Sequence, residues 1–302
     1  MPHGHKQHMN SSKIPLWVLS LPLIAVCIWS LNIAVTRYVT AFIEPVSISF
    51  YRWLVAFMLL TPLMLPQVIR QRHIIQPHLK KLAVLSAFGM VLYQGLAYTA
   101  AHYTTATNMG IINAFIPVFT IFTAFFVLGE RPQIYAILGT TLSLFGLLFV
   151  IAQGSVQHLL VLGQHSGDVL MLFAVFFYAF YGVYLKKWQL ALPLMISLYV
   201  QIFFALIYHL PFLAFTGLDK LNQHNMMSVL YAGIFPSLIA PLLWMLAVQK
   251  LGPSQTSVFM NLMPVVTAII AYVWLHEAWT IYHSIGGIII LVGILLAQRK
   301  TS

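Results

Sequence analysis

An internal repeat is the feature that most constrains this chain of 302 residues. When residues 107–150 are aligned without a gap to residues 254–297, 12 of 44 positions are identical. A proline, a glutamate, a tyrosine and two glycines keep the same order in both copies, which a shared apolar composition alone does not produce. Weaker matches extend the repeat backwards, as between Phe88 and Phe235. The sequence therefore predicts two copies of one structural unit.

The composition excludes a soluble globule. Hydrophobic residues make up 61% of the chain and charged residues 7%, whereas a soluble domain carries about 25% charged residues. The apolar residues form blocks of about 20, the length of helix that crosses a hydrocarbon core of about 30 Å. We therefore predict an all-α integral membrane protein with ten transmembrane helices. The expected spans are residues 15–36, 46–65, 80–101, 107–128, 132–152, 168–188, 192–213, 227–249, 254–275 and 279–297.

The number of spans sets the relation between the two copies. A unit of five helices ends on the side opposite to its start, so the second copy must be inverted relative to the first. With the N-terminus in the cytoplasm, twelve Lys and Arg residues fall in inner segments and two in outer ones, a strong positive-inside bias. The net charge of +10 is thus explained by membrane topology, and we expect no nucleic-acid partner. The expected organisation is a tail (1–13), a first repeat (14–152), an external link (153–167), a second repeat (168–298) and a tail (299–302).

Two prolines occupy the same position in the two copies. Pro117 and Pro264 lie near the middle of their predicted spans. A proline inside a helix removes a backbone hydrogen bond and kinks the helix, and the carbonyl left free must face protein or a water-filled cavity. Prolines are common in membrane helices, but interrupted helices at matching positions of two inverted halves indicate a central transport site.

Polar and aromatic residues inside the spans are the candidates for lining that site. A buried amide needs a partner within the membrane, so Asn32, Asn113 and Asn261 should face the bundle interior, where they line a cavity or join helices. The aromatic candidates could instead belong to the interfacial belts. The predicted cavity residues are Trp29, Asn32, Tyr93, Tyr98, Asn113, Tyr178, Trp244 and Asn261.

Ionisable residues are scarce within the spans. Arg52 lies near the outer end of the second span, where we expect a structural anchor that snorkels outward or pairs with Glu44. Glu130 and Glu277 follow the fourth and ninth spans, and we expect them to cap the next helix rather than to carry protons. No Asp or Glu falls in the middle of a span, so no carboxylate proton relay is predicted.

The remaining residue types point to packing rather than to chemistry. Glycines and a serine in the fifth and tenth spans predict close helix packing, within the subunit or in a dimer. The single cysteine, Cys27, excludes a disulfide framework and a cysteine metal cluster. No set of nucleophile, acid or metal ligands converges at one depth, so we expect neither an enzyme nor a bound metal or cofactor.

Four runs of residues carry a recognisable family pattern. They are Trp29 to Asn32, Ser49 to Trp53, Tyr93 through Pro117 to Arg131, and Leu251 through Pro264 to Glu277. Together they resemble the EamA-type transporters of the drug/metabolite transporter superfamily, over about residues 15–297. The resemblance implies two inverted EamA repeats in a bacterial inner membrane and, in many members, export of amino acids or other metabolites. It also implies a cavity lined mainly by the first, third, fourth, sixth, eighth and ninth helices, which supports the cavity candidates.

We therefore expect a secondary-type transporter that exports a small organic metabolite by alternating access between the two halves. An aromatic, weakly charged cavity suits an amino acid or a derivative, held by stacking and cation–π contacts. The alternatives are a multidrug or other-solute efflux carrier with proton coupling, and a non-transporting membrane scaffold. The expected partners are the small-molecule substrate and the lipid bilayer; both termini should be cytoplasmic, and a monomer and a homodimer both fit the sequence.

Overall fold

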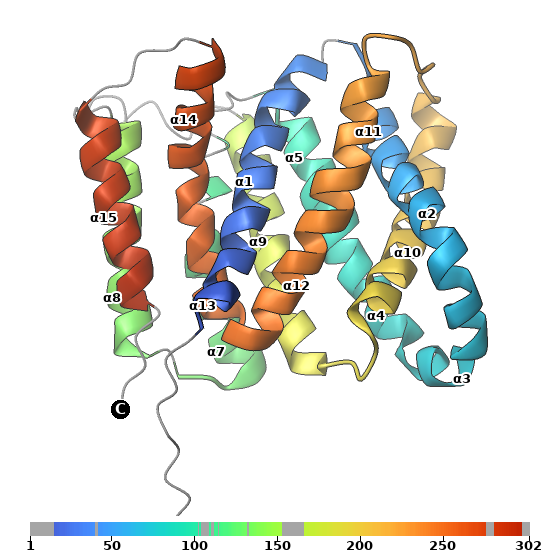
Figure 1. The fold of residues 1–302 in the computed structure, drawn as a ribbon, viewed down its shortest axis with the longest axis horizontal. Helices are drawn as coiled ribbons and strands as arrows, with labels where there is room; N and C mark the ends of the chain where they lie inside the picture. Colours follow the sequence, from blue (N-terminus) through green and yellow to red (C-terminus); the bar gives the residue numbers. More distant parts are fainter. Residues whose placement is uncertain are drawn as a thin grey trace, which may run out of the picture.

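The computed structural model of the chain describes residues 15–39, 42–101, 103, 109, 112–113, 115–131, 133–152, 166–275 and 281–297. This described part is a bundle of helices without a strand (Figure 1). Within these described residues, six helical stretches are long and apolar enough to cross a membrane: Leu16–Ile33, Pro45–Arg70, Arg72–Ala101, Val169–Trp188, Leu194–Thr216 and Met226–Leu251. Shorter apolar helices cover Ile116–Leu128, Ile134–Gly146 and Ser284–Ala297. The chain is therefore a multi-pass membrane protein, and its outer surface is apolar, with Phe126 and Phe215 exposed by 67% and 90%.

The first repeat begins with two long helices, α1 (Leu16–Val39) and α2 (Pro45–Arg70). The short helix α3 (Arg72–Ile75) and the 3-10 turn η1 (Gln76–His78) follow. The next stretch consists of α4 (Leu79–Ser86), the π-helical turn η2 (Ala87–Leu92) and α5 (Tyr93–Ala101). The repeat ends with α7 (Ile116–Leu128) and α8 (Ile134–Ile151).

The second repeat follows the same order. It begins with α9 (Ser166–Trp188) and α10 (Leu194–Thr216). Another interrupted stretch consists of α11 (Met226–Ile234), the π-helical turn η4 (Phe235–Ile239) and α12 (Ala240–Leu251). The last elements are α13 (Pro253–Ser257), the 3-10 turn η5 (Val258–Leu262), α14 (Met263–Leu275) and α15 (Ile281–Ala297). The observed ends lie within a few residues of most predicted ends.

Helix packing follows the sequence repeat. The repeat pairs α1 with α9, α2 with α10, α5 with α12, α7 with α14 and α8 with α15. Helix α1 packs on α12 and α14, and its counterpart α9 packs on α5 and α7. In the same way α2 packs on α11 and α10 packs on α4, while α2 contacts α10 and α8 contacts α15 (Figure 1). Exchanging the two halves therefore preserves the contacts, which confirms the predicted two-repeat architecture.

Two π-helical turns, which sequence reasoning did not predict, fall at matching positions of the two halves. The N–H of Tyr93 bonds to the carbonyl oxygen of Phe88, five residues earlier, at the end of η2. At the end of η4 the N–H of Ala240 bonds to the carbonyl oxygen of Phe235. Such turns disturb the regular pairing of backbone groups and occur often at functional sites.

The prediction that Pro117 and Pro264 kink the middle of a helix is wrong. Each is the second residue of its helix, α7 or α14, where the missing N–H would have no helical partner anyway. Before Pro264 the chain forms α13 and then the 3-10 turn η5, so the ninth span is interrupted as expected. Pro264 thus starts the second segment of an interrupted span, and Pro117 starts α7, whose preceding residues lie largely outside the described part of the chain.

Glycines bring α8 and α15 into close contact. A Cβ atom built on Gly146 would lie 2.9 Å from the carbonyl oxygen of Gly286, and one on Gly293 would lie 2.7 Å from that of Gly139. These spacings leave no room for a side chain, because the backbones themselves touch. The predicted close packing is confirmed, and it lies within the subunit.

Candidate transport site

Four aromatic side chains from four helices meet between the two repeats. The ring of Trp29 (α1) lies 5.3 Å from that of Trp244 (α12) and 6.3 Å from that of Tyr178 (α9), measured between centroids. The ring of Tyr93 (α5) lies 4.6 Å from that of Tyr178. We call these four residues the aromatic cluster. Centroid distances of 4.5–7 Å are typical of favourable aromatic pairs, so the rings pack directly on one another.

The position of the aromatic cluster follows from the repeat. The sequence match between Ala25-Val26 and Ala174-Val175 makes Trp29 and Tyr178 counterparts in the two halves. Counterparts that touch must lie at the pseudo-symmetry axis that relates the halves. The cluster therefore sits at the centre of the boundary between the repeats, where a carrier built from two repeats binds its substrate.

Trp29 is oriented by the irregular turn η4. Its indole Nε1–H donates a hydrogen bond of 3.1 Å to the carbonyl oxygen of Pro236. In a regular helix the N–H of Ala240 would donate to that oxygen, but here it donates to the carbonyl oxygen of Phe235. The next residue, Pro241, has no N–H, so the carbonyl oxygen of Pro236 has no partner within its own helix. The π-helical turn thus exposes an acceptor, and the indole of Trp29 satisfies it.

An amide extends the aromatic cluster on the side of Tyr93. The Tyr93 hydroxyl donates a hydrogen bond of 3.1 Å to Oδ1 of Asn113, which is buried. Asn113 therefore lies beside the cluster, as expected for a cavity residue, and its oxygen is occupied by the tyrosine.

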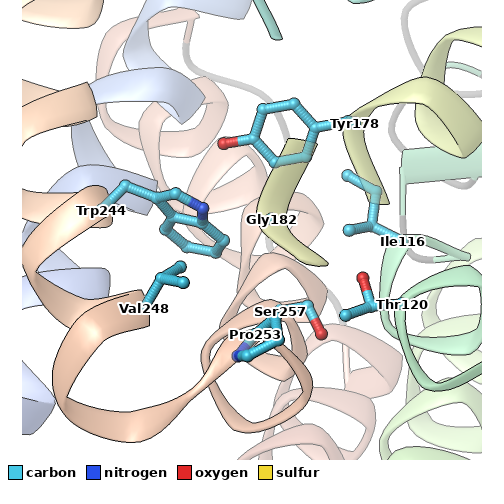
Figure 2. A pocket seen from close by; sticks show the side chains of 8 residues that line it. All are labelled: Ile116, Thr120, Tyr178, Gly182, Trp244, Val248, Pro253 and Ser257. Atoms are coloured by element: carbon cyan, nitrogen blue, oxygen red, sulfur yellow. The ribbon is translucent and has the colours of Figure 1, made fainter. Parts of the chain in front are cut away.

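A small cavity lies directly beside the aromatic cluster. Figure 2 shows Tyr178 and Trp244 on one side of it, with Thr120 and Ser257 opposite. The cavity has room for about one water molecule, so it is too small for an amino acid. The full lining consists of Ile116, Thr120, Tyr178, Gly182, Trp244, Val248, Pro253 and Ser257. Among the described residues, the rings of the aromatic cluster are therefore closed on one another.

Arg52 is fully buried, which corrects the expectation that it snorkels outward or pairs with Glu44. Its Nε donates a hydrogen bond of 2.6 Å to Oγ of Ser237. Its Nη1 donates one of 2.8 Å to the hydroxyl of Tyr98 and one of 3.2 Å to Oε1 of Gln94. We call Arg52, Gln94, Tyr98 and Ser237 the arginine cluster.

The carboxylate of Glu44 is therefore not the partner of Arg52. The backbone N–H of Glu44 donates to Asp219, and the guanidinium of Arg52 lies 5.2 Å from the ring centroid of Trp53 instead. The sequence predicts that Tyr98 lines the cavity, but its hydroxyl accepts a hydrogen bond from Arg52.

Ser237 was not among the predicted site residues. The only sequence feature that could have indicated it is its place beside Pro236 in a proline-bearing helix.

Two of the predicted amides lie elsewhere. Asn261 is buried in η5, and its Nδ2 donates to Oγ of Ser143 in α8, so it joins the two repeats. Asn32 is half-buried on α1, three residues after Trp29. Of the eight predicted cavity residues, the structure brings five together at the aromatic cluster and places Tyr98 next to it.

The helix-end glutamates take no part in this site. Gly129 ends α7 with φ of +67° and bonds through its N–H to the carbonyl oxygen of Phe125. Glu130 follows as an exposed residue, and no described residue bonds to its carboxylate, so the expected cap is not observed there. Glu277 lies outside the described residues, and its capping role stays a prediction. Within the described ranges, no three His, Cys, Asp or Glu side chains gather as a metal site.

Comparison with known proteins identifies the family. The model of the EamA-like transporter family matches residues 16–152 and 165–298. An uncharacterized transporter of Archaeoglobus fulgidus is 29% identical over 267 residues, covering 85% of this chain and 89% of that protein. A probable terminal-alkyne amino-acid exporter of Streptantibioticus cattleyicolor is 27% identical, covering 74% of each. A crystal structure with 15% identity has a TM-score of 0.75 and covers 93% of this chain and 97% of its own, which shows the same fold. The chain therefore belongs to the EamA-like transporter family.

Proposed function

We propose that this protein is a secondary transporter that exports a small organic metabolite, an amino acid or a derivative. The observation that carries the proposal is the aromatic cluster, which draws on helices of both repeats and surrounds the pseudo-symmetry axis. Aromatic rings beside a few polar groups suit a solute with an apolar and a polar part. The name of the relative from Streptantibioticus cattleyicolor, a probable amino-acid exporter, supports the same class of solute.

The proposed topology has ten spans in two inverted repeats, residues 14–152 and 168–298. It places both termini in the cytoplasm of a bacterial cell, with the protein in the inner membrane. The distribution of Lys and Arg along the sequence and the bounds of the two family matches support this arrangement.

The closed aromatic cluster suggests how access alternates. Trp29 and Trp244 belong to one packed helix pair, α1 and α12, and Tyr93 and Tyr178 belong to its counterpart, α5 and α9. Separating these two pairs opens the cluster, first to one side of the membrane and then to the other. The π-helical turns η2 and η4 interrupt one helical stretch of each pair, which makes them suitable hinges.

Counterflow into proteoliposomes tests the proposed function. Purified protein is reconstituted into vesicles loaded with one unlabelled amino acid or metabolite, and entry of the labelled form is followed with and without an imposed pH gradient. We expect uptake of one class of amino acid or derivative without a gradient. Uptake that occurs only with a proton gradient and extends to unrelated drugs would favour a proton-coupled multidrug carrier. No uptake of any solute by folded protein would favour a scaffold.

A further inference from the structure

Among the residues that the structure describes, the arginine cluster holds a positive charge without a counter-ion. The three groups that bond to Arg52 are a hydroxyl, an amide oxygen and a phenol, all of them neutral. Its third nitrogen, Nη2, is buried and has no hydrogen-bond partner among the described residues. An arginine side chain stays charged at any physiological pH. A buried charge of this kind is costly unless an opposite charge joins it.

The fold itself does not require these polar residues. The repeat places Val200 at the position of Arg52, and Met90 at the position of Ser237. It places Pro241 and Met245 at the positions of Gln94 and Tyr98. Val200, Met90 and Met245 are buried, so the symmetry-related region, which draws on both halves, is packed with apolar side chains. A polar cluster whose symmetry-related region is apolar is therefore better explained by a ligand than by helix packing.

The arginine cluster adjoins the aromatic cluster along two chain segments. Ser237 and Pro236 are neighbours in the chain. The hydroxyl of Ser237 accepts a hydrogen bond from Arg52 Nε, and the carbonyl oxygen of Pro236 accepts one from the indole of Trp29. Gln94, which accepts from Nη1, follows Tyr93 of the aromatic cluster. Hydrogen bonds fix both Nε and Nη1 of Arg52. Because the guanidinium is planar, they fix the direction of Nη2 as well.

We propose that Arg52 binds the carboxylate of the transported solute through Nη2, while the aromatic cluster binds its apolar part. This inference rests on the proposed function and names the chemistry of its substrate. The solute class is a small carboxylate, either an amino acid or a simple organic acid with an aliphatic or aromatic group. Organic cations without a carboxylate are excluded, because the site already carries one unpaired positive charge.

Matched compounds test this inference on the unmodified, full-length protein. Phenylalanine and 3-phenylpropionate carry a carboxylate, and phenylalaninamide has the same ring without it; leucine and leucinamide form a second pair. Binding is followed by titration of tryptophan fluorescence and by thermal unfolding in detergent. We expect each acid to bind at least about tenfold more tightly than its amide, the effect of one hydrogen bond to a charged group. Equal binding of acid and amide, or no binding of any compound, would overturn the inference.

Substitution of the arginine provides the second test. Arg52→Gln should raise the dissociation constant of the acids to that of the amides, and Arg52→Lys should give an intermediate loss because the charge remains without the planar fork. Arg72→Gln, which removes an exposed positive charge on α3, is the matched control and should bind like the unmodified protein. An Arg52→Gln protein that folds and still prefers acids would refute the role of Arg52. If that variant does not fold, the comparison of acids with amides still decides.

Counterflow with the same compounds separates this inference from the proposed function. Uptake of leucine and leucinamide at equal rates would show that the protein transports solutes but does not recognise their carboxylate. The proposed function would then stand, and the inference about Arg52 would fail. Selective binding of the acids without uptake of any compound would support the carboxylate site and contradict transport. Selective binding with selective uptake supports both.

Discussion

The contact between α8 and α15 gives a stability prediction with a magnitude that the structure sets. In Gly293→Ala the new Cβ atom would lie 2.6 Å from the backbone nitrogen of Ser143 and 2.7 Å from the carbonyl oxygen of Gly139. Ordinary contacts begin at 3.4 Å, so the two helices must separate by several tenths of an ångström. Because the atoms in the way are backbone, no side chain can rotate aside. Overpacking of this kind costs about 1–3 kcal/mol.

Gly287→Ala on the same helix is the matched control. Its Cβ would lie 3.4 Å from the nearest atom, Cγ1 of Val265, an ordinary contact. The gain of helix propensity is up to about 1 kcal/mol, so this variant should be neutral or slightly stabilised. Thermal unfolding of both variants in one detergent measures the difference. Equal melting temperatures would refute the packing argument.

Three further substitutions test single contacts. Trp29→Phe leaves the carbonyl oxygen of Pro236 without its partner, and we expect a loss of about 1–3 kcal/mol, seen as a lower melting temperature; an unchanged value would show that the π-helical turn does not need the indole. Tyr98→Phe removes a neutral partner of Arg52, so about 1.5–3 kcal/mol should be lost; chemical unfolding that matches the unmodified protein would contradict this. Asn261→Leu breaks the bond to Ser143 and should cost about 0.6–1.7 kcal/mol in a membrane protein, and a gain in thermal stability would argue against it.

Much of the fold could be predicted because the repeat and the apolar blocks are strong signals. The match of Phe88 with Phe235 placed two helical stretches in equivalent positions, and the structure gives both the same π-helical turn. The turn itself was not predictable, because no residue type specifies it alone. Pro117 and Pro264 were assigned to helix middles because sequence shows where apolar character continues, not where a helix is interrupted and restarts.

The aromatic cluster could be predicted in part, since Trp29, Tyr93, Tyr178 and Trp244 were selected as interior residues of different spans. Their mutual contact depends on how four helices are rotated, which hydropathy does not fix. The burial of Arg52 was missed for a similar reason. Its depth in the sequence fits a snorkelling side chain equally well, and only tertiary packing brings its neutral partners within hydrogen-bond distance.

The most direct test of the central claim compares counterflow by Trp29→Ala and Trp17→Ala. Both residues lie on α1, but Trp29 belongs to the aromatic cluster, whereas Trp17 is 54% exposed on the outer surface. If the cluster is the transport site, Trp29→Ala should lose most uptake of the labelled solute while Trp17→Ala retains it, at equal amounts of folded protein in the vesicles. Full uptake by folded Trp29→Ala would contradict the claim that the solute passes through this cluster.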